Sequence, residues 1–382
     1  MGVESKTGVE SEAGGQPGPS TAIPRDRFRL ATPFEAPREA AELRLVRLWE
    51  EILGIRGLGV LDDFFDLGGD SISATALMAE IDRVYGRAML PSALIKHPTV
   101  RSLAALLAEA GTPADGHPLL PIRATGNRPP LFMVHAAWGT VLFARRMLPH
   151  LDPGQPLFAL QGRGLVEGEE PHTRFEAMAA DYAQAIRAVR PQGPYLLAGL
   201  CVGGLIALEI ARILKAAGEE IRFLGMIDPA LHPSVVPWLR WDKPDGVSAR
   251  LQRTASRLAW YVKRRRLDVA RRALDGQVQT PAGYVPPDLG RQAAVHAGAK
   301  AALKAYRPLP YDGPVTIFFS KEHRADFEAN AGRTQALAPR IDIVELGVLH
   351  EHLFAAELNA LGRALQRRLD LAAEGEPGAK AW

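Results

Sequence analysis

The sequence predicts a multidomain protein in which a small all-α helix bundle precedes a larger α/β domain. Apolar residues recur at helical spacing between residues 40 and 108. After residue 118, short apolar runs of strand type alternate with helical segments. A Gly- and Pro-containing linker at residues 111–117 separates the two patterns. With 382 residues, 47% of them apolar, the chain is long enough for two or three domains.

Composition excludes several classes of protein. The formal net charge of +3 is too small to argue for a nucleic-acid or membrane partner, and we expect neither. One cysteine excludes an intramolecular disulfide framework and any multi-cysteine metal site, so no metal is predicted. No signal-like apolar stretch follows Met1, and Lys6 stands where a myristoylation signal needs Ser or Thr. We therefore expect a cytoplasmic protein.

Both ends of the chain have the composition of disordered segments. Residues 1–38 are rich in Gly, Ser, Pro, Glu and Thr, and Gly-Val-Glu-Ser occurs at 2–5 and again at 8–11. Such a segment cannot bury enough apolar surface to offset the entropy lost on ordering. We expect a disordered leader at residues 1–38, serving as a linker or a docking tail, and a disordered tail at residues 371–382.

Residues 39–110 carry the predicted helix bundle. Helical periodicity marks residues 40–53, a second helix beginning near Ser71, and residues 99–107, with a long loop between the first two. Ser71 follows two glycines at the start of its helix. Taken alone, a serine in that position is typical of a helix N-cap.

The residues around Ser71 carry a resemblance to a known family. Asp-Asp-Phe-Phe-Asp-Leu-Gly-Gly-Asp-Ser-Ile, at residues 62–72, resembles the phosphopantetheine attachment motif of peptidyl and acyl carrier domains, and the resemblance covers residues 40–108. It implies a four-helix carrier bundle in which Ser71 bears a covalent 4'-phosphopantetheine added by a phosphopantetheinyl transferase. A helix N-terminus also suits the phosphodiester, because free N–H groups and the helix dipole favour an anion.

The α/β domain is expected at residues 118–370. A helix is predicted at 175–189, and strands covered by helices on both faces imply a mostly parallel sheet. The predicted strands lie at residues 131–134, 157–160, 195–198, 223–227, 315–319 and 341–344.

Cys201 lies where the strand 195–198 gives way to a helix. Gly199 and Gly203 flank it in a G-x-C-x-G pattern, which is typical of the sharp strand-to-helix turn called a nucleophile elbow. A helix N-terminus also stabilises a thiolate. A membrane segment is the alternative, but the apolar run at 195–208 is shorter than the roughly 20 residues that cross a bilayer. A buried core cysteine is the second alternative, but Gly199 and Gly203 would weaken a simple core helix. The pattern favours a catalytic cysteine in an α/β-hydrolase domain.

The acid of a catalytic triad follows the nucleophile in this fold, and the histidine comes last. Asp228 directly follows the strand 223–227, so it should lie at the carboxyl end of the sheet. It could instead be a turn residue before Pro229. Asp326, in the loop after the strand 315–319, is the rival acid. We favour Asp228 because the end of a strand fixes a carboxylate better than a long loop does.

Residues 118–370 resemble the release thioesterases of peptide and polyketide synthetases. The resemblance is carried by Leu120-Pro121-Ile122-Arg123, Leu131-Phe132-Met133-Val134-His135, Gly193-Pro194-Tyr195-Leu196-Leu197-Ala198-Gly199 and Ala305-Tyr306-Arg307-Pro308. It implies that His350 is the base, since Leu353 and Phe354 follow it at the family's spacing. Leu349 departs from the Gly or Asp usual before that histidine, so His352 stays an alternative.

The same resemblance implies an oxyanion loop at residues 135–139, with the backbone N–H groups of Ala137 and Val202 as donors. Trp138 replaces a small residue that is usual there. Its indole would narrow the acyl pocket, stack on an aromatic acyl group, or simply pack in the core. An insertion at about residues 231–300 fits a helical lid. Within it, the run 263–266 is either a solvated face or a contact to a carrier phosphate.

Together the two resemblances imply a carrier–thioesterase pair of nonribosomal peptide or polyketide biosynthesis. The acyl chain would come from an upstream synthetase or an acyl-loading enzyme acting in trans. Release from Cys201 would occur by cyclisation, aminolysis or hydrolysis, and a cysteine keeps the acyl group activated as a thioester, which favours the first two. The alternatives are a hydrolytic editing thioesterase and a non-catalytic carrier module with a degenerate hydrolase domain.

Overall fold

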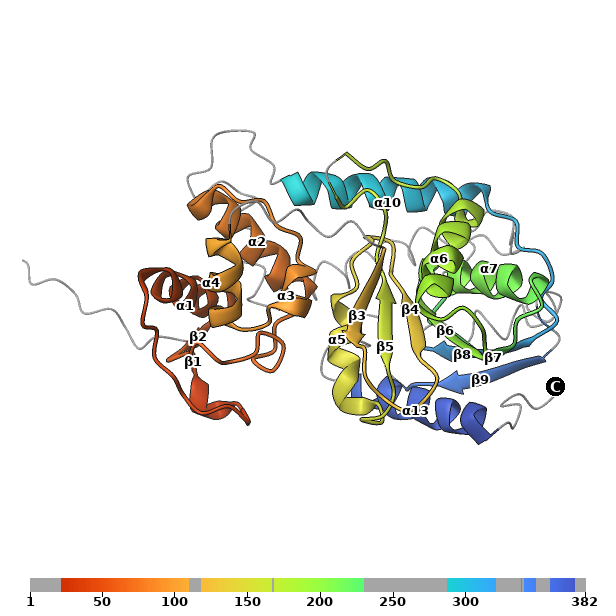
Figure 1. The fold of residues 1–382 in the computed structure, drawn as a ribbon, viewed down its shortest axis with the longest axis horizontal. Coiled ribbons are helices and arrows are strands. Elements are labelled where there is room, and N and C mark those ends of the chain that lie inside the picture. The colour runs from red at the N-terminus through yellow and green to blue at the C-terminus, as the bar shows by residue number, and fades with distance from the viewer. Residues whose placement is uncertain are drawn as a thin grey trace, which may run out of the picture.

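A computed structural model describes residues 22–109, 118–166, 168–229, 287–320, 338, 340–347 and 358–374 (Figure 1). We call residues 22–109 the helical domain and the described residues from 118 onward the α/β domain. Among these residues no helix is both long enough and apolar enough to cross a membrane.

The helical domain packs four helices around one apolar core. They are α1 (Ala40–Leu53), α2 (Ser71–Tyr85), α3 (Ala93–Lys96) and α4 (Val100–Ala108). Trp49 of α1 is fully buried and meets Phe64, in the loop before α2, edge to face at 5.1 Å between ring centroids. The loop thereby supplies part of the core and is held against α1 where it approaches α2.

The predicted disordered leader is wrong for residues 22–38, whereas residues 1–21 lie outside the described part. Strand β1 (Ile23–Pro24) pairs in parallel with β2 (Ile55–Arg56), and the short helix η1 (Arg25–Arg27) follows. Arg25 donates from Nε and Nη2 to the two oxygens of the buried Asp62 carboxylate, at 2.7 and 2.6 Å. This bidentate ion pair raises the pKa of Arg25 and ties the segment to the core. The average composition of residues 1–38 did not predict this ordered segment, because polar residues surround the few residues that contact the core.

The α/β domain is built on a seven-stranded sheet in the order β3-β5-β4-β6-β7-β8-β9. Strand β3 is antiparallel to β5, and all other neighbours run parallel, which confirms the predicted mostly parallel sheet. The strands are β3 (Leu119–Arg123), β4 (Leu131–Val134), β5 (Leu157–Leu160), β6 (Tyr195–Leu200), β7 (Ile221–Ile227), β8 (Pro314–Phe319) and β9 (Arg340–Glu345).

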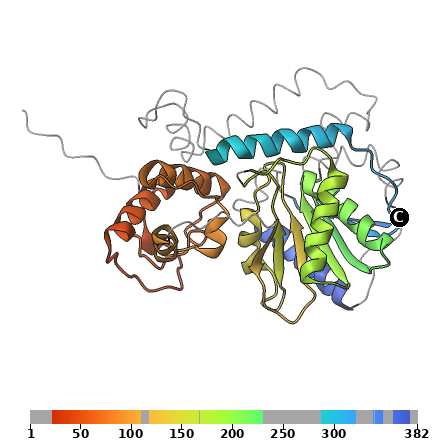
Figure 2. The same ribbon diagram turned by 45° about the horizontal axis from the view of Figure 1, so that its top comes forward.

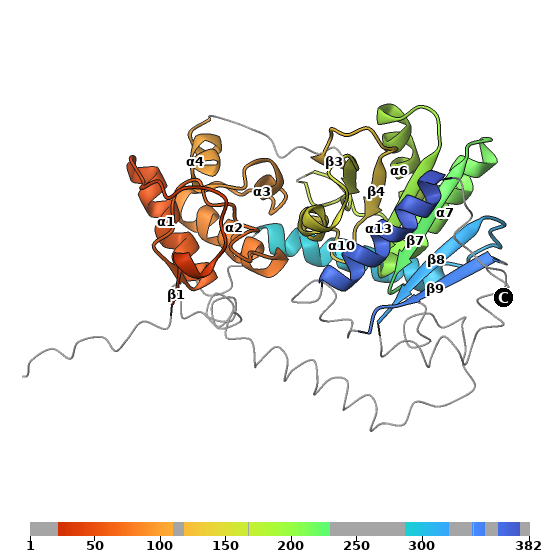
Figure 3. The same ribbon diagram turned by 90° about the horizontal axis from the view of Figure 1, so that it is seen from below.

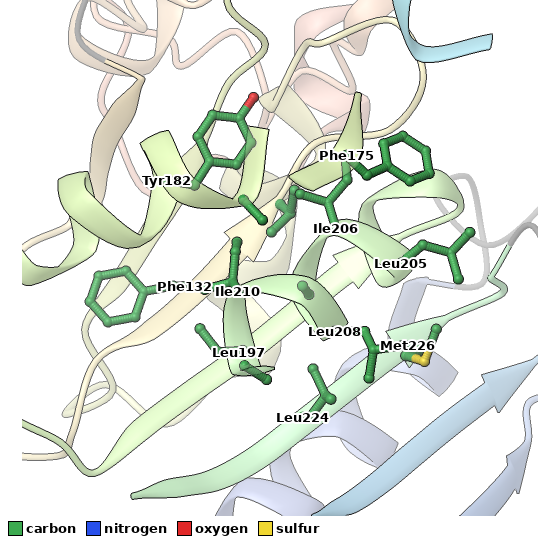
Figure 4. Close-up of a cluster of buried hydrophobic side chains, with 14 of the residues drawn as sticks. Phe132, Phe175, Tyr182, Leu197, Leu205, Ile206, Leu208, Ile210, Leu224 and Met226 are labelled. Atoms are coloured by element: carbon green, nitrogen blue, oxygen red, sulfur yellow. The ribbon is translucent and has the colours of Figure 1, made fainter. Parts of the chain in front are cut away.

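Helices cover both faces of this sheet. Helices α6 (Phe175–Val189) and α7 (Val202–Ala216) share one apolar cluster with β4, β6 and β7, where Phe132, Leu197 and Met226 meet Tyr182 and Ile206 (Figure 4). The opposite cluster holds α5 (Leu142–Met147) and α13 (Leu358–Glu374) (Figure 3). Between α5 and β5 lies the short helix η2 (Leu148–His150).

Helix α13 corrects the predicted disordered tail for residues 371–374. The helix continues to Glu374, and Ala372 is buried against the sheet. Its apolar face, which includes Leu361, Leu365 and Leu369, continues through Ala372, so the last turn gains core contacts. Residues 375–382 lie outside the described part.

Helix α10 (Pro287–Ala305) belongs to the end of the predicted lid insertion and the segment after it. Figure 2 shows it extending from the helical domain across the α/β domain, and it contacts both α2 and α6. The rest of the predicted lid, residues 231–286, lies outside the described residues, as does the basic run 263–266.

Candidate active site

Cys201 stands in a strained turn between β6 and α7. Its φ of 56° and ψ of −117° are rare for any residue with a side chain and cost about 1–3 kcal/mol. A Cβ on Gly199 would lie 2.0 Å from the carbonyl oxygen of Gly203, and one on Gly203 would lie 2.3 Å from that of His135. Only glycine fits either position, so the turn has the geometry expected of a nucleophile elbow.

The backbone around Cys201 is held from both sides. Its N–H donates to the carbonyl oxygen of Ile227 at 2.9 Å, and its own carbonyl accepts from the N–H of Gly204 at 3.1 Å. The side chain is partly buried, and it lies at the N-terminus of a 15-residue helix whose dipole favours negative charge. The strained turn therefore fixes the backbone of Cys201 at the start of α7, with the residue partly exposed.

Asp228 lies beside Cys201 at the same edge of the sheet. Leu200 and Ile227 are partners in the β6–β7 register, and the two candidate residues each follow one of them. Asp228 also has a positive φ, 42°, and its N–H donates to the carbonyl oxygen of Phe318 at 2.7 Å. The structure thus brings the predicted nucleophile and the favoured acid together at the carboxyl ends of paired strands.

Ser320 holds the carboxylate of Asp228. The backbone N–H of Ser320 donates to Oδ1 at 3.1 Å, and its hydroxyl lies 3.0 Å from both carboxylate oxygens. Both side chains are buried, and Ser320 directly follows β8. A buried carboxylate needs such donors, so Ser320 fixes the orientation of the candidate acid.

The remaining candidates for the triad, His350, His352 and Asp326, lie outside the described residues. Strand β9 ends at Glu345, paired in register with Phe319 of β8, so β9 ends at the same edge of the sheet as β8. Within the part of the chain that the structure describes, no group of three or more His, Cys, Asp or Glu side chains could hold a metal ion.

The predicted oxyanion loop follows β4, whose Val134 pairs with Gly199 of the elbow strand. The carbonyl oxygen of Ala136 accepts two hydrogen bonds, from Nδ1 of His135 at 2.6 Å and from the N–H of Gly139 at 2.9 Å. In a trans peptide the carbonyl and the next N–H point in opposite directions. Holding the Ala136 carbonyl therefore also fixes the direction of the Ala137 N–H. Val202 begins α7, directly after Cys201.

His135 is a buried histidine with a defined tautomer. Burial is the main cause that lowers its pKa to about 4, so the ring is neutral near pH 7. Because the Ala136 carbonyl can only accept, the single ring proton resides on Nδ1. The Tyr182 hydroxyl has one proton and two acceptors within reach, Nε2 of His135 at 2.7 Å and the carbonyl oxygen of Gln161 at 3.0 Å. Burial raises the pKa of Tyr182, which keeps the phenol a donor.

Trp138, the next residue of the loop, does not pack in the core. It is 51% exposed, and its indole stacks on the imidazole of His296 with 4.3 Å between centroids and 14° between planes. Val295 of α10 packs closely against two glycines at this point. A Cβ on Gly139 would lie 2.8 Å from Cγ1 of Val295, and a Cβ on Gly162 would lie 3.0 Å from the same atom. Helix α10 thus borders the oxyanion loop.

Ser71 is the first residue of α2, and it is exposed. Asp70 caps the helix, since its Oδ1 accepts from both the N–H and the hydroxyl of Ser73 at 2.9 Å. The Ser71 hydroxyl is therefore not needed as a cap. An exposed hydroxyl on the first turn of a 15-residue helix fits the attachment of a phosphodiester.

Sequence reasoning missed four residues of this site: Ser320, Tyr182, His296 and the side-chain role of His135. Ser320 carried a usable signal, because it directly follows a predicted strand next to the one that precedes Asp228. The contacts of Tyr182 and His296 join segments far apart in the chain, and no spacing pattern indicates them.

Comparison with known families agrees with two functional domains. Residues 44–107 match the family of the phosphopantetheine attachment site, and residues 129–256 match the thioesterase domain family. The chain therefore contains a phosphopantetheine attachment domain, which is the site of covalent 4'-phosphopantetheine, and a thioesterase domain.

Parts of this chain are similar to several synthetases. Malpinin synthetase of Mortierella alpina is 37% identical over 207 residues, which are 53% of this chain and 3% of that protein. The dimodular nonribosomal peptide synthase of Bacillus subtilis is 37% identical over 207 residues, 54% of this chain and 9% of that protein. A four-domain nonribosomal peptide synthetase of known structure covers 90% of this chain at a TM-score of 0.55 and 26% identity, over 27% of its own length. The chain thus spans only a small part of these relatives.

Proposed function

We propose that this chain is a carrier–thioesterase unit of nonribosomal peptide or polyketide biosynthesis that releases an acyl or peptidyl chain through an acyl-Cys201 intermediate. The observation that carries the proposal is the strained turn at Cys201, with a φ of 56° and two glycines that tolerate no side chain. Strain of this kind persists where the surroundings impose it, and it exposes a nucleophile above the sheet edge.

We assign the attachment of 4'-phosphopantetheine to Ser71. When bound, this group supplies a terminal thiol that carries the acyl chain as a thioester. Asp70 frees the Ser71 hydroxyl by capping α2 in its place. Gly69 keeps the approach to the helix compact, because a Cβ there would lie 2.3 Å from the ring of Phe64.

In the proposed acylation step, Sγ of Cys201 attacks the thioester carbonyl carbon. His350 takes the thiol proton and then gives it to the leaving thiol, while Asp228 orients the imidazole and stabilises its charged form. The carbonyl oxygen becomes an oxyanion and accepts from the N–H groups of Ala137 and Val202. The fixed peptide between Ala136 and Ala137 supports this role, because a preorganised donor does not have to reorient.

In the proposed release step, water, an amine or a nucleophile within the acyl chain attacks the acyl-Cys201. His350 takes the proton of the attacking group, and Cys201 leaves as the thiolate or thiol. Because a thioester is more activated than an oxoester, a cysteine suits aminolysis or cyclisation, where the attacking group is poor or the product is strained. Products of wild type and Cys201→Ser would be compared on one acyl chain, and free acid alone from both at similar rates would overturn this preference.

The proposed partners follow from the two domains. A phosphopantetheinyl transferase modifies Ser71, and an upstream synthetase or an acyl-loading enzyme supplies the chain. The alternative enzymatic function is hydrolytic editing of mischarged carriers, which predicts faster release of incorrect acyl groups than of the native acyl group. A non-catalytic module predicts no difference between wild type and Cys201→Ala.

The proposal is tested by intact mass and release rate. We expect the transferase to add one phosphopantetheine to wild type and none to Ser71→Ala. On a loaded chain, His350→Ala and Asp228→Asn should abolish release, whereas His352→Ala and Asp326→Asn should spare most of it. The opposite ranking within either pair would exchange the assignments, and unimpaired release from Cys201→Ala would overturn the mechanism.

A further inference from the structure

We propose that α5 and α10 form the docking surface for this chain's own helical domain, with the Asp63–Arg145 ion pair setting its position. The functional consequence of docking rests on the function proposed above, in which Ser71 delivers an acyl chain to Cys201. The contacts themselves are independent of that function, and they join the two domains at three points.

The first point of contact is polar. Arg145 of α5 donates from Nη2 to Oδ2 of Asp63 at 2.9 Å, across the boundary between the domains. Asp63 is held rigidly for this contact, because its Oδ1 accepts from the N–H of Phe65 at 2.8 Å. Asp66 also interacts electrostatically with Arg145. Burial and the charge of Asp63 raise the pKa of Asp66 overall, and the charge of Arg145 partly offsets this increase. Two carboxylates of the helical domain thus face one guanidinium, which is an arrangement that selects register.

The second point of contact is apolar and lies on α5. Leu142, the first residue of that helix, is 1% exposed and belongs to the core cluster of the helical domain. Conversely, Ile95 of α3 packs against the cluster that holds α5 and α13. Each domain therefore contributes a side chain to the core of the other. Burial of large aliphatic side chains contributes more to affinity than an exposed ion pair does.

The third point of contact lies on α10. Leu90, between α2 and α3, forms a separate buried cluster with Val295 of α10 and Leu165. These three side chains are 6%, 2% and 3% exposed, so the contact excludes water. An ion pair combined with buried apolar contacts forms a docking surface in which the charges set the register and the apolar groups supply affinity.

This surface borders the predicted oxyanion loop. Helix α5 begins shortly after Trp138. Val295 of α10 contacts Leu90 of the helical domain and also packs closely against Gly139 of the loop. The neighbouring His296 stacks on Trp138. The docked domain is consequently held against the elements that border the candidate active site. Because Asp63 lies in the loop that leads to Ser71, the ion pair also determines how the attachment helix faces that site.

The occupant is therefore this chain's own helical domain, and the test separates docking from chemistry. Two acyl donors are compared in the full chain: the acyl group loaded on the Ser71 arm, and a soluble pantetheine thioester that needs no docking. Docking is also measured without chemistry, by hydrogen exchange of residues 142–147 and of α10 in the unmodified protein. The variants are Asp63→Arg, Arg145→Asp and the double exchange, with Asp63→Asn as a milder change that keeps an Oδ1 acceptor for Phe65.

Each single charge reversal should slow acylation of Cys201 from the arm by at least about tenfold, because like charges then oppose each other across the boundary. It should speed exchange in residues 142–147 and leave the rate with the soluble thioester within about twofold. The double exchange should restore both the rate and the protection. As a matched control, Lys215→Glu breaks the exposed Lys215–Asp312 pair on the far side of α7 and should change neither readout.

Equal effects of a single reversal on both donors, or a double exchange that restores neither readout, would overturn the docking surface. Two full-length variants test the occupant: Cys201→Ala loaded on its Ser71 arm as donor, and Ser71→Ala as acceptor. Faster acylation of Cys201 between these two chains than within one wild-type chain would assign the surface to a second copy and would also overturn the proposal. If neither donor acylates Cys201, the proposed function fails, while hydrogen exchange still decides whether the domains dock as described.

Discussion

The indole of Trp138 and the imidazole of His296 lie face to face beside the oxyanion loop, 4.3 Å apart. The pair joins the residue after Ala137 to α10, which Val295 holds against Gly139 and Gly162. The exposed indole is therefore supported on one face, and we expect it to form a wall at the entrance to the candidate active site. This arrangement favours the role of Trp138 in narrowing the acyl pocket over its role as a core residue.

Trp138→Ala should widen the entrance. We expect the ratio of kcat/KM for a bulky acyl thioester to that for a small one to rise by roughly tenfold, the size of effect that one pocket contact supplies. His296→Ala should shift the ratio in the same direction by less, because it removes only the support of the indole. A fall in the rate with aromatic acyl groups alone would show instead that the indole stacks on the substrate.

Gly203→Ala should destroy the elbow. The added Cβ would lie 2.3 Å from a backbone oxygen of His135, which cannot move without shifting the oxyanion loop. We expect a loss on the order of 3 kcal/mol in the free energy of unfolding and loss of release activity. Gly290→Ala is the control, since that α10 glycine has no heavy atom within 4 Å of its Cβ position and should be neutral or slightly stabilised. Equal behaviour of the two variants in urea unfolding would contradict the account.

Ser320→Ala removes the hydroxyl that holds Asp228 but keeps the backbone N–H donor. We expect kcat to fall by about tenfold with KM changed by less than about twofold, because the oriented acid acts in the transition state. Stability should drop by about 1–3 kcal/mol, since a buried carboxylate loses a partner. Thr316→Val, within β8, also removes a buried hydroxyl, but not the one that holds Asp228, and should leave kcat unchanged. A fall in kcat of the same size in both variants would refute the positioning role.

His135 predicts a specific dependence of stability on pH. Its pKa is about 4 in the folded protein and about 6.5 when unfolded, so the unfolded state binds more protons as the pH falls below 6.5. Stability is therefore full above that pH and is lost progressively toward pH 4. Between about pH 7.5 and about pH 4.5, wild type should lose about 2–3 kcal/mol more than His135→Gln, in which this titration is absent. Parallel losses in urea unfolding would show that His135 is not buried neutral.

The sequence predicted those parts of the site that depend on local spacing. Gly199 and Gly203 indicate the elbow because two close backbone approaches both exclude a side chain. Asp228 could be placed because parallel strands end at one edge of a sheet, whatever their order. Helices α1, α2 and α4 follow from periodicity in the same way. Helix α3 has only four residues, which is too short to show a periodic pattern.

Other parts depend on contacts between distant segments and left no periodic signal. Tyr182 reaches His135 across 47 positions, and His296 reaches Trp138 from a helix whose apolar pattern is weak. Residues 22–38 were misjudged because average composition does not register a single arginine that meets a buried carboxylate, as Arg25 meets Asp62. Such contacts can be identified only when the three-dimensional positions of both residues are known.

The account as a whole depends on transfer of the acyl chain to Cys201, and peptide mass mapping of a loaded, quenched sample measures this directly. We predict an acyl adduct on the peptide that contains Cys201, which neutral hydroxylamine removes because it is a thioester. Cys201→Ser should show an adduct that resists the same treatment, and Cys201→Ala should show none on that peptide. An acyl group found only on the Ser71 arm, together with undiminished product release by Cys201→Ala, would contradict the mechanism.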